Sequence, residues 1–172
     1  MKSVTPFTPQ IGRNVYIDPS AQIIGRVKIG DYSSVWPGCV LRGDINTITV
    51  GRYSNIQDLS LVHLETNRGT KIGDYVTVGH QVVLHACTVK DQSLIGIGSI
   101  LLDGSVVGSG TILGAGSLLT HGQKLKPGAL YFGRPAKFVR FLSKKEIKGL
   151  KDWALRYVRY SADHIAGKFE RL

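Results

Sequence analysis

The sequence predicts an all-β fold, a parallel β-helix built from hexapeptide repeats and followed by one α-helix. An aliphatic residue recurs about every sixth position, glycine often follows it, and a small or β-branched residue tends to lie four positions on. A six-residue period of this kind is typical of a parallel β-helix, in which each unit is one short strand and a turn. The aliphatic positions are Ile11, Ile17, Ile23, Ile29, Val35, Leu41, Val50, Ile56, Val62, Ile72, Val78, Leu84, Val89, Ile95, Leu101, Val107, Leu113 and Leu119.

Three hexapeptides are expected to close one triangular coil, so these eighteen positions give about six coils. We number the faces of the triangle one, two and three, starting from the units of Ile11, Ile17 and Ile23. Neighbouring coils lie one strand spacing apart, roughly 4.8 Å. Stacked coils bury one continuous apolar column, and no single repeat is stable alone. The repeats define a domain over residues 1–122.

The segment after Leu119 is expected to leave the repeat, with a connecting loop and turn over residues 123–142 and an α-helix over residues 143–172. Ser143 and Glu146 have the spacing of a capping box, which favours a helix start at this point. Apolar residues then follow at helical spacing and form one face. We expect this face to pack along the flank of the β-helix; a helix lying on a membrane surface is the alternative.

Composition narrows the functional classes. The chain has 172 residues and a net charge of +10, but only 8% of its residues are aromatic, and no nucleic-acid-binding module is visible. We therefore expect an anionic substrate or a solvated basic surface, with no nucleic-acid partner. No apolar run approaches the length of a membrane span, and the amino terminus lacks the pattern of a secretion signal. The sequence thus predicts a cytoplasmic protein with no membrane partner.

The repeat fixes where the histidines point. Val62 and Leu84 begin units on face three of successive coils, and His63 and His85 directly follow them. Both imidazoles therefore project outward from the same face, one strand spacing apart, and can share a metal ion. Arg42 has the same position one coil earlier.

His80 lies two residues after Val78, which begins a unit on face two, so it projects from another side of the triangle. Two arrangements remain open: a two-histidine site, or a three-histidine site completed by a neighbouring subunit. We favour the second, because a threefold trimer would set face two of one subunit against face three of the next. Asp58 has the same position in the repeat as His80, one coil earlier. His121 and His164 are interpreted as non-catalytic.

Several motifs together resemble the γ-class carbonic anhydrase family, from near residue 10 to the terminal helix. The motifs are Arg42-Gly43-Asp44, Asn55-Ile56-Gln57-Asp58, Val62-His63, Gly79-His80-Gln81-Val82-Val83-Leu84-His85 and Gly133-Arg134-Pro135-Ala136. The resemblance implies a homotrimer of left-handed β-helices with three metal sites at subunit interfaces. It implies that His63 and His85 of one chain and His80 of its neighbour hold Zn²⁺, with Fe²⁺ or Co²⁺ as alternatives.

The resemblance also implies roles for other residues. Gln57 would orient a zinc-bound hydroxide that hydrates CO₂ to bicarbonate, because three neutral imidazoles leave zinc the charge to lower the pKa of water to about 7. Arg42, Asp44 and Asp58 would form a charged network across the interface. Tyr131 would line the pocket.

The chain departs from the family pattern at its proton-transfer residues. Ile45 stands where that pattern has a glutamate, and the loop after His63 is short, with Glu65 as its one acid. Slow CO₂ hydration is therefore expected, with Glu65 as a candidate substitute proton shuttle. Three other functions remain open: a metal-dependent thioesterase acting on acyl-CoA, an acyltransferase using His121, and a non-catalytic trimeric scaffold.

Overall fold

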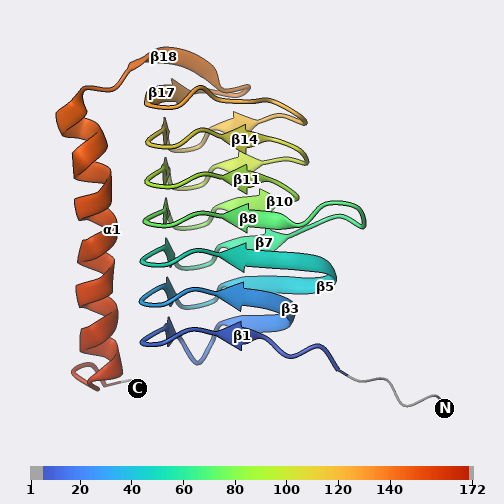
Figure 1. Ribbon diagram of the computed structural model, residues 1–172, viewed down its shortest axis with the longest axis vertical. Helices are drawn as coiled ribbons and strands as arrows, with labels where there is room; N and C mark the ends of the chain where they lie inside the picture. The colour runs from blue at the N-terminus through green and yellow to red at the C-terminus, as the bar shows by residue number, and fades with distance from the viewer. Residues whose placement is uncertain (1–5, 171–172) are drawn as a thin grey trace.

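The computed structural model describes residues 6–170, and the outermost residues of the first and last predicted segments, 1–5 and 171–172, lie outside them. The chain winds upward as a stack of short strands, with one long helix along its side (Figure 1). The elements are β1 Gln10–Ile11, β2 Tyr16–Ile17, β3 Gln22–Ile29, β4 Ser34–Val35, β5 Val40–Val50, β6 Asn55–Ile56, β7 Leu61–His63, β8 Thr70–Ile72, β9 Thr77–Val78, β10 Val83–His85, β11 Thr88–Val89, β12 Leu94–Ile95, β13 Ile100–Leu101, β14 Val106–Val107, β15 Ile112–Leu113, β16 Leu118–Leu119, β17 Ala129–Phe132, β18 Lys137–Phe141 and α1 Lys144–Ile165.

The strand register confirms the hexapeptide prediction. On face three, Val62 pairs in parallel with Leu41 below it and with Leu84 above it, and Leu84 pairs with Leu101. These side chains have no exposed surface and form part of one continuous core. Face two is an eight-stranded sheet, whereas faces one and three join in a ten-stranded sheet because β3 and β5 run through both. The parallel β-helix is thus confirmed; its left hand stays an implication of the family resemblance.

The β-helix continues beyond the predicted boundary at residue 122. Leu125 and Tyr131 follow Leu119 at further six-residue steps, and both are buried in the core. Tyr131 pairs with Leu113, so β17 adds a seventh parallel strand to face two and one coil to the expected six. An aliphatic pattern does not predict this coil, because a tyrosine fills its inward position. Residues 123–142 also hold β18, antiparallel to β17, and are therefore more than a connecting loop.

The helix α1 packs on the flank of the stack, as predicted. It contacts β2, β4 and β9 and buries Leu150, Ala154 and Ser161. Figure 1 shows it running along the height of the stack. Because the apolar face is covered by strands, the alternative of a helix lying on a membrane surface is not supported. Within residues 6–170, no helix combines the length and apolar character that a bilayer span requires.

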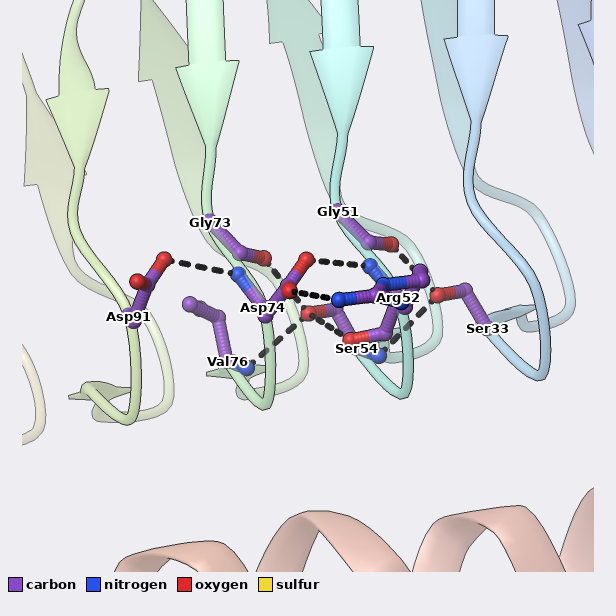
Figure 2. Close-up of polar contacts among 8 residues, drawn as sticks. All are labelled: Ser33, Gly51, Arg52, Ser54, Gly73, Asp74, Val76 and Asp91. Carbon is purple, nitrogen blue, oxygen red and sulfur yellow. Dashed lines mark hydrogen bonds and ion pairs between the residues drawn. The ribbon is translucent and has the colours of Figure 1, made fainter.

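Polar side chains tie successive coils together at the corner between faces one and two (Figure 2). The Asp74 carboxylate accepts a hydrogen bond from the backbone N–H of Arg52 at 2.7 Å, and the N–H of Asp74 donates to Asp91 on the next coil at 2.9 Å. The Ser54 hydroxyl donates to the carbonyl of Gly73 at 2.7 Å. At this corner the small residue of the repeat is polar, because its side chain forms hydrogen bonds with backbone groups in the turns between strands.

We expect Glu146→Gln to lower the melting temperature at pH 7 and to have progressively less effect as the pH falls. Hydrogen bonds from Arg140 and from Ser143 hold the pKa of Glu146 down at about 2. A depressed carboxyl pKa contributes stability above the unfolded pKa, about 4.3, and loses it toward the folded value. Glutamine keeps the capping hydrogen bond but loses the charge facing Arg140.

The measurement is thermal unfolding followed by circular dichroism at several pH values between 7 and 2.5. Asp152→Asn is the control, because it removes a carboxylate on the exposed side of the same helix. An offset between Glu146→Gln and wild type that is the same at every pH would contradict the prediction.

Candidate metal centre

Two histidines project side by side from neighbouring strands. His63 ends β7 and His85 ends β10, and the two residues are direct parallel partners. Their nearest nitrogens, His63 Nδ1 and His85 Nε2, are 3.3 Å apart. Nitrogen ligands at 2.0–2.1 Å in tetrahedral geometry lie about 3.3 Å from each other. The pair is therefore spaced as two ligands of one tetrahedral ion, as the face count predicted.

His80 lies on face two, in the turn after β9, and its side chain is 43% exposed. Within residues 6–170 of one chain, no three His, Cys, Asp or Glu side chains are grouped so that they could hold a metal ion. His80 thus does not join the His63–His85 pair inside a single subunit. The choice between a two-histidine site and a shared three-histidine site stays a prediction.

In each of the three imidazoles, one ring nitrogen lies within hydrogen-bonding distance of a carboxylate oxygen. The pairs are His63 Nε2 with Asp44 Oδ1 at 3.1 Å, His80 Nδ1 with Asp58 Oδ2 at 2.9 Å, and His85 Nδ1 with Asp103 Oδ1. A carboxylate on one nitrogen of a metal-binding histidine fixes the ring orientation and tautomer and makes the other nitrogen a better ligand. The chemistry of this donor set therefore fits a zinc site.

Asp103 is a residue that the sequence interpretation missed. It follows Leu101 by two positions, and Leu101 pairs with Leu84, the residue before His85. Asp58 follows Ile56 by the same two positions, and Ile56 pairs with Val78, which precedes His80 by two residues. A search for acids two positions after the inward residue of each adjoining coil would have found both.

Arg42 and Asp44 meet beside His63 within one chain. The charged network across a subunit interface that the resemblance implied stays a prediction. Arg42 Nη1 forms an ion pair with Asp44 Oδ2, and Arg26 Nη2 donates to the backbone carbonyl of Asp44 at 2.8 Å. Desolvation raises the pKa of Asp44, but hydrogen bonds from His63 and Arg42 outweigh it, so the pKa falls to about 2. Asp44 is therefore a carboxylate throughout the physiological range and holds His63 through a charged hydrogen bond.

Gln57 is buried on face two, one coil below His80. Its Nε2 donates to Asn55 Oδ1 at 3.0 Å, and Asn55 Nδ2 donates to Thr77 Oγ1 at 3.1 Å. Gln57 and His80 line one cavity of about 410 Å³ between face two and α1. This chain of amides fixes the orientation of the Gln57 side chain, as a residue that positions a small substrate requires.

Comparisons with known proteins place this arrangement in a family. Residues 8–43 match the family model described as bacterial transferase hexapeptide (six repeats). A "Probable carbonic anhydrase" of Methanocaldococcus jannaschii is 53% identical over 151 residues, which cover 88% of this chain and 95% of the relative. "Gamma carbonic anhydrase 2, mitochondrial" of Arabidopsis thaliana is 45% identical over 92% of this chain. The chain belongs to the γ-class carbonic anhydrase family.

This γ-class chain spans 59% of the length of that Arabidopsis relative. Among solved structures, a hexapeptide transferase family protein from Anaplasma phagocytophilum is 44% identical, with a TM-score of 0.87, and the match covers 91% of this chain and 92% of that one. The family and the fold therefore rest on matches over most of the chain.

Tyr131 is part of the core of its own γ-class chain. It occupies the inward position of β17, is 7% exposed, and accepts a hydrogen bond from the backbone N–H of Lys126 at 3.1 Å. Three strand pairings separate Tyr131 from Val78, the residue near His80. The six-residue step thus directs the phenol ring into the core, and a place for Tyr131 along a pocket shared between subunits stays a prediction.

The structure shows the surroundings of Ile45 and Glu65, the two residues that the sequence analysis connected with proton transfer. Ile45 is 47% exposed near Asp44, and its side chain cannot exchange protons. Glu65 lies in a tight hairpin where its backbone exchanges hydrogen bonds with Arg68 at 3.1 and 3.3 Å. His121, the residue of the acyltransferase alternative, lies exposed in the turn after β16.

Proposed function

We propose that this protein is a metal-dependent carbonate dehydratase that hydrates CO₂ to bicarbonate at the interfaces of a homotrimer. The 3.3 Å spacing of the His63 and His85 nitrogens carries the proposal, since it matches the spacing of ligands on one tetrahedral ion. The family supports carbonate dehydration over the thioesterase, acyltransferase and scaffold alternatives, because the relatives that cover most of this chain include proteins named carbonic anhydrase. Zn²⁺ fits the three imidazoles best, and Fe²⁺ or Co²⁺ can take the same ligands.

Each residue of the proposed site has a separate role in the hydration of CO₂. A bound Zn²⁺ would supply the Lewis acidity that makes water a nucleophile near neutral pH. His63 and His85 would hold it from one chain, with His80 of the partner subunit as the third ligand. Gln57 would orient the attacking water by a hydrogen bond from its fixed amide. Water adds to the carbon of CO₂, bicarbonate leaves, and one proton must reach solvent.

Exposed apolar residues support a trimeric assembly. Ile24 and Leu102 continue the outward column of Arg42, His63 and His85 on face three, and they are 42% and 37% exposed. On face two, Ile97 lies one coil above His80 at the same position of the repeat and is 53% exposed. Apolar side chains in register with ligands on both faces favour burial of both columns against a second subunit. Cyclic symmetry with three subunits would bury all of them.

The test is metal analysis and stopped-flow CO₂ hydration of wild type, His80→Ala and His121→Ala. We expect about one ion per chain in wild type and loss of both metal and rate in His80→Ala, because two imidazoles bind zinc far more weakly than three. His121→Ala should match wild type. Wild-type metal and rate in His80→Ala would refute the proposal, and hydrolysis of acyl-CoA esters without CO₂ hydration would replace it with the thioesterase.

A further inference from the structure

A second cavity, of about 310 Å³, also borders His80, and Gln57 is not among the residues that line it. Its walls come from face two and from the carboxyl-terminal end of α1, and they include Asp58, His80, Trp36 and His164. A cavity of this size holds several water molecules at about 30 Å³ each. His164 is the one imidazole besides His80 that lines it.

The position of His164 is fixed by aromatic neighbours. Its ring lies edge-on to Trp36 at 5.1 Å between centroids and contacts Tyr16 at the same centroid distance. The Tyr16 hydroxyl lies 3.3 Å from His164 Nδ1 and donates a hydrogen bond to the Asp18 carboxylate at 2.9 Å. Because Nδ1 is engaged with Tyr16, Nε2 is the ring nitrogen that can take up and release a proton, and the His164 side chain borders the cavity.

CO₂ hydration requires a group that receives the proton and returns it to solvent. Ile45 cannot do so, and Glu65 belongs to the hairpin after β7 rather than to this cavity. Imidazole is the side chain whose ordinary pKa, about 6.5, allows rapid uptake and release near neutral pH. This requirement rests on the proposed function.

We propose that His164 is the proton relay of this enzyme. The proton leaves the water molecule that attacks CO₂, crosses the water of the cavity, and binds to His164 Nε2. His164 then releases it to buffer, so the ring returns to its neutral form and the overall products are bicarbonate and one solvent proton. The subunit that contributes His80 to a site thus also contributes its relay. A purely structural role for His164, as packing for Trp36, is the competing interpretation.

Among residues 6–170, titratable groups face His164 from three directions. Tyr16 and Asp18 approach from β2, Asp58 and His80 from face two, and the others from the terminal part of the chain. Those remaining groups are Tyr157, Tyr160 and Asp163. A pH profile alone therefore cannot single out His164, and the test needs a variant that keeps its contacts.

His164→Gln is that variant, since glutamine can hydrogen-bond to Tyr16 but cannot take up a proton near neutral pH. In dilute buffer we expect kcat to fall at least tenfold while kcat/KM stays within about twofold, because proton release follows the addition of water to CO₂. Added imidazole buffer should restore kcat. His121→Gln is the control that should keep wild-type kcat, and Glu65→Gln tests the competing carboxylate.

Two results would overturn the relay: wild-type kcat for His164→Gln in dilute buffer, or a parallel fall in kcat and kcat/KM without rescue by imidazole. A loss of kcat in Glu65→Gln alone would assign the relay to Glu65. Wild-type protein that shows no CO₂ hydration would instead refute the proposed function, and the relay with it.

An independent measurement uses metal-free protein. The His164 ring resonances, assigned by comparison with His164→Gln, should shift with pH between about 5 and 8 if the ring exchanges protons with solvent. Resonances that do not respond over this range would overturn the relay whatever the activity. Matching circular dichroism spectra and melting temperatures of variant and wild type would show that the fold is intact.

Discussion

A mixture of His80→Ala and His63→Ala subunits is expected to regain about a quarter of the wild-type metal content, although neither variant alone binds metal tightly. Each proposed site takes His63 and His85 from one subunit and His80 from the next around the threefold axis. A site is intact only where a His80→Ala subunit supplies the pair and a His63→Ala subunit supplies His80. Random mixing produces that order at one site in four. Metal bound per trimer, after joint refolding and gel filtration, is the measurement.

The control for this experiment is a mixture of His63→Ala and His85→Ala subunits. The pair must come from one chain, because His63 and His85 are partners in adjacent strands of the same sheet. No arrangement of these two variants rebuilds an intact site, so no recovery is expected. Equal recovery in both mixtures, or full metal in either variant alone, would contradict a shared site. A two-histidine site within one chain predicts full metal in His80→Ala.

The sequence was sufficient to pair His63 with His85 because a β-helix leaves little freedom in strand register. Each coil is covalently joined to the next, and a one-residue slip would turn the inward aliphatics toward solvent. Counting faces therefore places residues 22 positions apart side by side, as the pairing of His63 with His85 confirms. The same count places Asp58 beside His80, and their 2.9 Å contact bears it out.

Other parts of the site could not be predicted in this way. The count places Asp103 one coil above His85, but the contact between its carboxylate and the His85 ring depends on side-chain conformation and not on the repeat. Tyr131 points inward although an aromatic residue replaces the usual aliphatic, so an aliphatic pattern does not predict this unit of the repeat. His164 is brought to face two by the path of α1, which depends on tertiary packing and not on the six-residue period.

The Asp103 carboxylate is expected to strengthen metal binding through its contact with His85. We expect Asp103→Asn to weaken metal binding by about 10- to 100-fold, the usual cost of removing a carboxylate behind a metal-binding histidine. Asparagine has a similar shape and can still accept the hydrogen bond from His85 Nδ1, so the ring should keep its place. The loss then comes from charge, because a neutral acceptor makes Nε2 a poorer donor to a cation. Competition with a chelator at fixed pH gives the affinity.

Asp91→Asn provides the comparison for Asp103→Asn. Asp91 accepts a backbone hydrogen bond from Asp74 at the corner between faces one and two, and it contacts none of the three histidines. This substitution removes the same charge from the chain, so a change in metal affinity shared by both variants would reflect net charge alone. If Asp103→Asn binds metal like wild type while His85→Ala does not, then backbone register and packing suffice to orient His85. The imidazole–carboxylate pair would in that case be a consequence of the fold and not a determinant of affinity.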